Sequence, residues 1–147
     1  KKIEFSIDSK EYMSKLADQR TIIIDASAIV GNITHHVVER FTLNSPKLEI
    51  KTPSIVKRNS SFNVTVNFRN PLTQILTNCS LIVEGKGFRR KIFKISDVAA
   101  SSISKTAFNL RTSSFVSETF VVKLYTKALK ESVGFAHIKI PQVQKEK

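Results

Sequence analysis

The stretch that decides the fold is Ser61-Phe62-Asn63-Val64-Thr65-Val66-Asn67-Phe68, in which apolar and polar residues alternate without interruption. Successive side chains of a β-strand point to opposite faces of the sheet, so the four apolar residues share one face. A strand of this kind is buried on one side only, which is typical of an antiparallel sheet packed on a second layer. Pro71 cannot donate a hydrogen bond to a ladder and is expected beyond the end of this strand.

Short strand-like stretches continue on both sides of this segment. They cover residues 48–51, 79–84, 89–95, 103–110, 119–126 and 134–140. Gly85 and Gly87 are expected in a hairpin turn, where glycine permits a positive φ, and Gly134 in a close turn before the last strand. About seven short strands within roughly 95 residues predict an all-β fold, an immunoglobulin-like β-sandwich over residues 46–141. The polar residues 142–147 are expected to form a disordered tail.

Residues 1–45 carry a different pattern. Apolar residues alternate from Ile3 to Ile7 and from Ile22 to Ala28, and a third strand is expected from Ile33 to Leu43. Between the first two stretches, a short helix with Ser9 as its N-cap fits the sequence. Three strands cannot easily bury a core of their own, since a small sheet needs a partner layer. We therefore interpret this segment as the C-terminal part of an incomplete β-sandwich, and the chain, which has no initiator Met, as a fragment.

The charge of the chain divides at the same place. The net charge is +12, from 24 Lys and Arg against 12 Asp and Glu, yet the basic and acidic residues of the segment 1–45 cancel. The excess therefore lies in residues 46–147, where it could attract a heparin-like polyanion, nucleic acid or an anionic membrane, or simply form a solvated surface. The densest basic cluster consists of Lys86, Arg89, Arg90, Lys91 and Lys94.

This basic cluster lies on a predicted strand, so its side chains should leave on both faces. Phe93 and Ile95 share a face with Lys91 and are expected to be core residues rather than a platform for stacked bases. No RNP-type, zinc-finger or helix-turn-helix pattern is present, so no specific nucleic-acid partner is expected. No apolar run approaches the roughly 20 residues of a transmembrane helix. Cytoplasmic and extracellular locations both stay open, because no signal peptide is visible and one cysteine decides neither.

Candidate catalytic residues are few. The single cysteine, Cys79, has the same strand parity as Leu81, so it is expected to point into the core as an inert apolar side chain. His35 and His36 are adjacent in a predicted strand and would point to opposite faces, while His137 belongs to the other predicted sandwich. No nucleophile–base pair, metal-ligand cluster or phosphate-binding glycine loop can be assembled from these residues. The sequence therefore predicts no catalytic and no metal-binding residues in this chain.

Several stretches, taken in order, resemble a known family. The first three are Phe68-Arg69-Asn70-Pro71-Leu72, Leu76-Thr77-Asn78-Cys79-Ser80-Leu81 and Val83-Glu84-Gly85-Lys86-Gly87-Phe88. They resemble an Asn-Pro-Leu turn, a Leu-x-x-Cys strand and a Val-Glu-Gly-x-Gly-Leu hairpin in the second C-terminal β-barrel of the animal, calcium-dependent transglutaminases. The run from Phe120 to Phe135 is similar to the closing strands of that barrel. Residues 1–45 resemble the end of the first C-terminal barrel, and Leu43-Asn44-Ser45-Pro46 the connection between the two.

The resemblance implies a portion of a protein-glutamine gamma-glutamyltransferase, an acyltransferase that forms isopeptide crosslinks between proteins. In that family a Cys attacks the carboxamide of a protein-bound Gln, ammonia leaves, and a Lys amine accepts the acyl group. The Cys-His-Asp set and the calcium sites lie in a catalytic domain that this chain does not contain. The chain is therefore expected to hold no cofactor and to catalyse nothing alone. Its partners would be that catalytic core, on which the barrels dock and which they regulate, and the protein substrates of the parent enzyme.

Arg40 is the one candidate nucleotide contact that the resemblance supplies. A subset of the family binds a guanine nucleotide with a basic residue of the inter-barrel region, and Arg40 falls at a comparable place. The aromatic residue that the family carries shortly afterwards is not matched, so a plain exposed arginine is the other interpretation. The alternative to the family as a whole is an unrelated β-sandwich used for adhesion, which would bind polyanions through the basic cluster.

Overall fold

The computed structural model of the chain describes residues 2–16, 20–113 and 116–142. The chain divides into two compact units, Lys1–Ser45 and Pro46–Lys147, which we call unit 1 and unit 2 and describe separately. The disordered tail expected over residues 142–147 lies outside the described residues, apart from Gln142.

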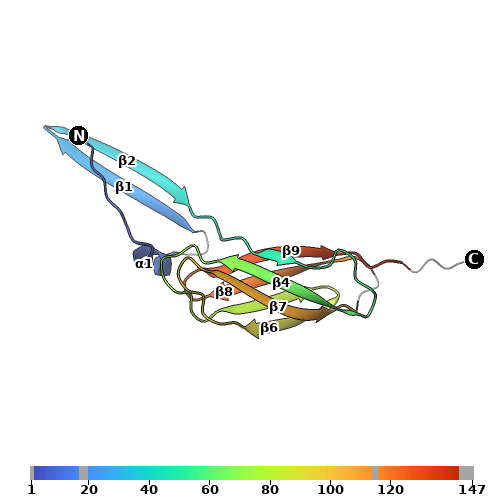
Figure 1. Ribbon diagram of the computed structural model, residues 1–147. Helices are drawn as coiled ribbons and strands as arrows, with labels where there is room; N and C mark the ends of the chain where they lie inside the picture. Colours follow the sequence, from blue (N-terminus) through green and yellow to red (C-terminus); the bar gives the residue numbers. More distant parts are fainter. Residues whose placement is uncertain (1, 17–19, 114–115, 143–147) are drawn as a thin grey trace, which may run out of the picture. The chain divides into compact units, whose positions relative to one another are not determined.

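Unit 2 forms seven strands within its described residues, arranged as two antiparallel sheets (Figure 1). One sheet has the order β3-β4-β7 and the other the order β6-β5-β8-β9, so β6 and β7 are both edge strands. The predicted all-β class and immunoglobulin-like sandwich are thereby confirmed. The strands are β3 (Glu49–Lys51), β4 (Ser61–Arg69), β5 (Ser80–Gly85), β6 (Phe88–Lys94), β7 (Ile103–Arg111), β8 (Glu118–Thr126) and β9 (Lys130–Ile138).

The core of unit 2 lies between the two sheets and follows the alternation of the sequence. Every second residue of β4, from Phe62 to Phe68, is buried, and β8 contributes the facing row. Phe120 of β8 is completely buried, and the centre of its ring lies 6.3 Å from that of Phe62 and 5.3 Å from that of Phe88. Burial of each such ring contributes about 2 to 3 kcal/mol, so this aromatic cluster holds the sheets together at one end of the sandwich.

Two expectations for the glycines of unit 2 were wrong. Gly134 lies inside β9, opposite Val122, rather than in a turn, because β9 begins at Lys130. The turn before it is residues 127–129, where the Thr126 hydroxyl accepts a hydrogen bond from the Leu129 amide at 3.0 Å. Gly85 does lie at the expected hairpin, but without a positive φ; a Cβ there would come within 2.7 Å of the Phe88 ring. Space, and not backbone freedom, is therefore what requires glycine at this position.

Unit 1 consists of a short helical segment and a long hairpin. The hairpin pairs β1 (Thr21–Val30) with β2 (Ile33–Thr42), in register from Thr21 opposite Thr42 to Val30 opposite Ile33. Gly31 and Asn32 connect the strands, and the φ of Gly31 is +62°, which tight two-residue hairpin turns require at this position. The helical segment comprises α1 (Ser9–Tyr12) and a 3-10 turn, Met13–Lys15.

The structure corrects two details of unit 1. The N-cap of α1 is Asp8 rather than Ser9, because the Asp8 carboxylate accepts a hydrogen bond from the Lys10 amide at 2.9 Å. Ile3 to Ile7 do not form a strand; within unit 1, Phe5 and Ile7 instead line an apolar pocket with Phe41 of β2. Ile3, Phe5 and Ile7 are each about half or more exposed, so the alternation in this stretch is accompanied neither by a hydrogen-bonded ladder nor by full burial.

Candidate functional site

Cys79, the residue on which any nucleophilic chemistry would depend, lies directly before β5 with its side chain in the core. Only 2 % of it is exposed, and its Sγ donates a hydrogen bond to the Leu76 carbonyl at 3.5 Å. Burial raises the pKa of the thiol, and the negative charge of Asp97 raises that pKa further. The neutral thiol is therefore the stable form, which is unsuited to nucleophilic attack. The expected core position of Cys79 is confirmed.

The histidines do not join Cys79 in a catalytic arrangement. In unit 1, His36 of β2 contacts the Asp25 carboxylate of β1, and both side chains are more than half exposed. His35 lies opposite Ala28 in the same hairpin. His137 of β9 contacts the Thr119 hydroxyl of β8 at 3.0 Å on the surface of unit 2. Among the described residues, no three His, Cys, Asp or Glu side chains are grouped closely enough to hold a metal ion.

Arg40, the candidate nucleotide contact, lies in β2 opposite Ile23. Its side chain is exposed, which both interpretations of this residue allow. The nucleotide contact of Arg40 therefore stays a prediction. The helices of the described segments are too short to cross a lipid bilayer.

The basic cluster of residues 86–94 is divided between the two faces of β6. Lys91 and Phe93 pair in register with Val83 and Leu81, whose side chains are buried, and so lie on the face toward the other sheet. The Phe93 ring stacks on that of Phe108 of β7, with 4.7 Å between ring centres. This aromatic side chain is thus occupied in packing the two edge strands together, as expected, and is not presented for base stacking.

Arg90 lies on the opposite, outer face of the same sheet. Its Nε is 2.9 Å from Oε1 of Glu84, and the other carboxylate oxygen of Glu84 is 3.5 Å from Nζ of Lys123. The charge of Arg90 is therefore partly neutralised by an acidic neighbour on β5. The five basic residues that the sequence groups together do not form one surface.

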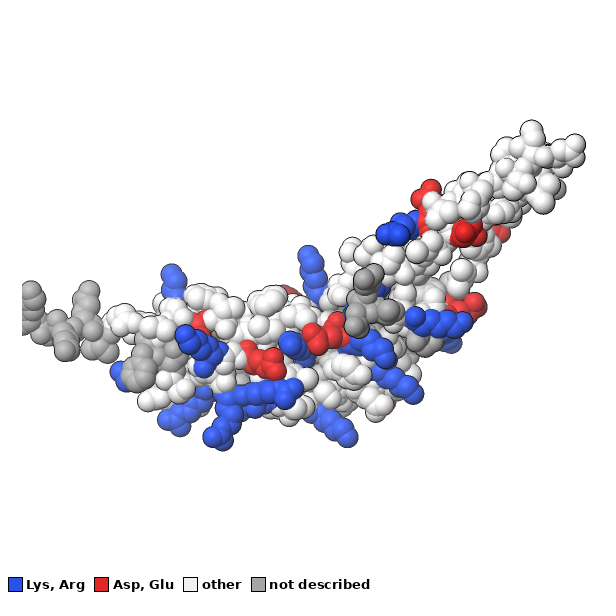
Figure 2. Space-filling view, turned by 180° about the vertical axis from the view of Figure 1, so that it is seen from behind, with Lys and Arg blue, Asp and Glu red and all other residues white. Residues whose placement is uncertain are grey.

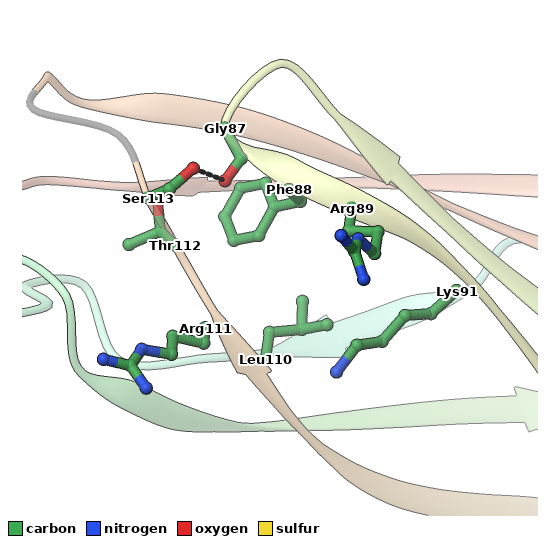
Figure 3. A pocket seen from close by; sticks show the side chains of 8 residues that line it. All are labelled: Gly87, Phe88, Arg89, Lys91, Leu110, Arg111, Thr112 and Ser113. Atoms are coloured by element: carbon green, nitrogen blue, oxygen red, sulfur yellow. Dashed lines mark hydrogen bonds between the residues drawn. The ribbon is translucent and has the colours of Figure 1, made fainter.

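A pocket of about 460 Å³ lies between the edge strands β6 and β7 (Figure 3). Arg89 and Lys91 of β6 extend their side chains toward Leu110 of β7, and Arg111 lies on the other side of Leu110 in this view. The lining residues are Gly87, Phe88, Arg89, Lys91, Leu110, Arg111, Thr112 and Ser113. Three basic side chains and two hydroxyl groups thus surround an apolar floor formed by Phe88 and Leu110.

Hydrogen bonds hold the rim of this pocket. The carbonyl of Gly87 accepts one from the Ser113 amide at 3.1 Å and one from the Ser113 hydroxyl at 3.3 Å. The Lys91 ammonium reaches across to the Asn109 carbonyl at 3.5 Å. These hydrogen bonds tie the β5–β6 turn and Lys91 to β7 and the residues after it, and so hold this part of the rim in place.

The charge pattern of the sequence points to Arg89 and Lys91 but not to Arg111 and Ser113. The latter two residues lie on β7 and directly after it, and only the packing of one edge strand on the other brings them to the pocket. No sequence motif links Arg111 and Ser113 to Arg89 and Lys91, because the distance between these residues depends on how the two sheets are aligned in the sandwich. The visible signal is limited to Arg111, a basic residue directly after the alternating stretch 103–110.

Comparison with known proteins gives matches both in sequence and in fold. No family model matches the chain. Over 103 residues, the sequence is 25 % identical to protein-glutamine gamma-glutamyltransferase K of the dog, Canis lupus familiaris, and 26 % identical to that of Homo sapiens. Each alignment covers 68 % of this chain and 13 % of the relative, so the chain spans a small part of the length of these proteins.

Among solved structures, the crystal structure of red sea bream transglutaminase matches 74 % of this chain and 17 % of its own, with a TM-score of 0.67 and 19 % sequence identity. The CARDB domain of a Pyrococcus furiosus protein matches 65 % of this chain and 94 % of its own, with a TM-score of 0.55 and 15 % identity. The chain therefore contains a region that resembles the β-barrels of transglutaminases, as the sequence motifs predict. The second match shows that this fold also occurs outside proteins named as transglutaminases.

Proposed function

We propose that this chain is a non-catalytic β-barrel portion of a protein-glutamine gamma-glutamyltransferase, with unit 2 as the second of two C-terminal barrels. The observation that carries the proposal is the sequence match to two gamma-glutamyltransferases over 103 residues. The seven-stranded sandwich, which has the fold of part of a transglutaminase, supports it independently of sequence identity. The ordered motifs of residues 68–88 fall within this sandwich.

The chemistry of acyl transfer explains why unit 2 is assigned a non-catalytic role in this proposal. Acyl transfer from a Gln carboxamide to a Lys amine needs an accessible thiolate beside an imidazole that can accept and return a proton. Cys79 is buried and protonated, and it lies in the core of unit 2, where it contacts the Leu76 carbonyl. In this proposal, the nucleophile and the calcium sites belong to a catalytic core elsewhere in a longer protein. Unit 2 then serves to dock on that core and to regulate access of protein substrates to it.

Unit 1 fits the end of a preceding barrel. Its hairpin exposes apolar side chains on both faces, including Ile23, Ile29, Val37, Val38 and Phe41, each of them about half or more exposed. A two-stranded hairpin with such side chains is marginal in water, and further strands packed on it would bury them. Arg40 of the same hairpin would, as a further part of the proposal, contact a nucleotide in members that bind one.

Amine incorporation tests the proposal. A fluorescent primary amine, a Gln-containing protein such as casein and calcium ions are incubated with the 147-residue chain, and separately with the protein encoded by its complete reading frame. We expect the complete protein to label casein and the 147-residue chain to give only the background seen with chelator. Labelling by the short chain above that background would overturn the assignment of a non-catalytic role. A complete reading frame without a catalytic Cys-His-Asp domain would overturn the transferase assignment itself.

A further inference from the structure

The β6–β7 edge of unit 2 concentrates positive charge. Lys and Arg side chains project along the lower margin of unit 2 in Figure 2, the margin along which Figure 1 shows β6. The acidic groups visible in Figure 2 lie higher on that face. Among the described residues of unit 2, Glu49 contacts Lys51, Glu84 contacts both Arg90 and Lys123, and Glu131 also contacts Lys123. None of these pairs includes a residue that lines the pocket.

The basic groups of the pocket lack acidic partners within the part of the chain that the structure describes. There, neither Arg89, Lys91 nor Arg111 lies within 4.0 Å of a carboxylate, in contrast to Arg90 next to Arg89. The polar partner of the Lys91 ammonium is a backbone carbonyl, which leaves its charge uncompensated. Like charges held close together repel each other, and a bound anion relieves this repulsion. A negative group bound in the pocket would therefore compensate charge that the described residues leave unpaired.

We propose that this pocket is a binding site for a single sulfate group of a sulfated polysaccharide. The guanidinium of Arg89 supplies a planar fork of N–H donors, and the Lys91 ammonium supplies a mobile point charge from the same strand. Ser113 lies at the opposite rim, where its amide and its hydroxyl both donate to the Gly87 carbonyl and hold the rim in place. Arg111 adds a further charge beyond Leu110. The site is independent of whether the parent protein is a transferase.

A sulfated polysaccharide is favoured over a nucleic acid by the aromatic side chains. Proteins that bind single strands without sequence preference stack bases on exposed aromatic rings. At this edge, Phe88 is buried, and Phe93 is stacked on Phe108. Neither ring of β6 is left for a base, whereas a sulfate ester needs only charge and hydrogen-bond donors. In this proposal Lys86, which is exposed in the turn before β6, contacts a neighbouring sulfate of the same polymer.

The test is the salt dependence of heparin binding by the complete 147-residue chain. The pocket variant carries Arg89→Gln and Lys91→Gln, and its matched control carries Lys127→Gln and Lys139→Gln, which removes the same charge from exposed positions directly after β8 and β9. We expect the pocket variant to bind at least tenfold more weakly, and the slope of log K against log salt to fall by about one for each basic side chain that no longer pairs with a sulfate. The control variant should change neither quantity by a comparable amount.

A second measurement does not depend on the variants folding. The unmodified, isotope-labelled chain is titrated with inorganic sulfate and, separately, with inorganic phosphate while the amide signals are recorded by NMR. We expect sulfate to shift the Gly87 and Ser113 amides before those of β9, and phosphate to shift the same amides. Equal loss of heparin binding in both double variants, or absence of these shifts, would overturn the pocket. Binding of single-stranded DNA as tightly as heparin at matched charge would overturn the assignment to a polysaccharide.

Discussion

Asn70 shows how one side chain organises a whole end of the sandwich. Only 1 % of it is exposed, and its amide nitrogen donates hydrogen bonds to the carbonyls of Gln74, Val98 and Ala99 at 2.8 to 3.2 Å. Its side-chain oxygen accepts one from the Leu72 amide at 2.9 Å. The Asn-Pro-Leu motif therefore has a physical reason: Asn70 pairs the Leu72 amide and the Gln74 carbonyl, and adds a hydrogen bond to the Val98 and Ala99 carbonyls, which also accept from the amides of Leu76 and Ser102.

We expect Asn70→Ala to lower the free energy of unfolding by about 2 to 4 kcal/mol, because it removes the four hydrogen bonds of a buried side chain, including those to the Leu72 amide and the Gln74 carbonyl. Asn63→Ala, at an exposed position of β4, is the matched control and should change it by about 0.5 kcal/mol or less. Urea unfolding followed by circular dichroism measures both. Equal effects of the two substitutions would show that the Asn70 network does not support the fold.

Cys79 provides a second prediction at the scale of one residue. Because burial raises the pKa of its thiol, native protein at about pH 8 should react with an aromatic disulfide reagent far more slowly than a free thiol does. In concentrated guanidinium chloride the same reagent should titrate one thiol per chain within seconds. Fast stoichiometric labelling of the native protein, monitored by absorbance, would contradict the core position.

At the scale of elements, the two sheets of unit 2 approach each other closely at Gly134. A Cβ at this position of β9 would lie 2.9 Å from both Cδ1 of Ile50 and Cβ of Leu48, which belong to β3 and the residues before it. Alanine replacing glycine in a strand usually stabilises a protein slightly. Gly134→Ala should instead destabilise unit 2 by about 1 to 3 kcal/mol, because the added methyl group forces β3 and β9 apart.

Thermal unfolding of Gly134→Ala, alone and combined with Ile50→Val, measures this effect. The second substitution removes one of the two clashing atoms, so we expect it to recover part of the lost stability. A Gly134→Ala variant as stable as the unmodified chain would show that the two strands do not approach as closely as described.

The elements also show which parts of the fold can be predicted from sequence. The alternation of β4 specifies its boundaries and its buried face, because every apolar residue in it serves the same core. The start of β9 is hidden in the sequence because Lys130 and Glu131 are exposed and Ser132 is buried, which breaks the apolar pattern. The stretch Ile3–Ile7 has the pattern without the strand, and its apolar side chains are about half or more exposed, since alternation alone does not determine which backbone groups pair.

The candidate site is less predictable than the fold, because alternation within one strand does not indicate which side chains another strand places beside it. Arg89 and Lys91 are visible as a charged stretch, but their separation from Arg90 follows only from strand parity. The contribution of Arg111 and Ser113 depends on contact between two edge strands of different sheets. Local sequence determines the face on which a side chain lies, whereas the partner across a sandwich is set by packing of the whole domain.

At the scale of the whole molecule, the two units differ in how completely they bury their apolar residues. Unit 2 has a continuous core, while most apolar side chains of the β1–β2 hairpin are exposed. Burial of apolar surface is the main favourable term in folding, so unit 2 holds most of the stability of the chain. This asymmetry agrees with the proposal that unit 1 is completed by further strands of a longer protein.

The central claim is that the sandwich supports a transferase without supplying its nucleophile. The most direct test is the rate of calcium-dependent amine incorporation by the protein from the complete reading frame, with and without Cys79→Ala. The account predicts that kcat/KM of this variant stays within about twofold of the unmodified protein, once folding is verified by circular dichroism, because Cys79 does not touch the substrate. A loss of about a hundredfold or more in a folded variant would contradict it.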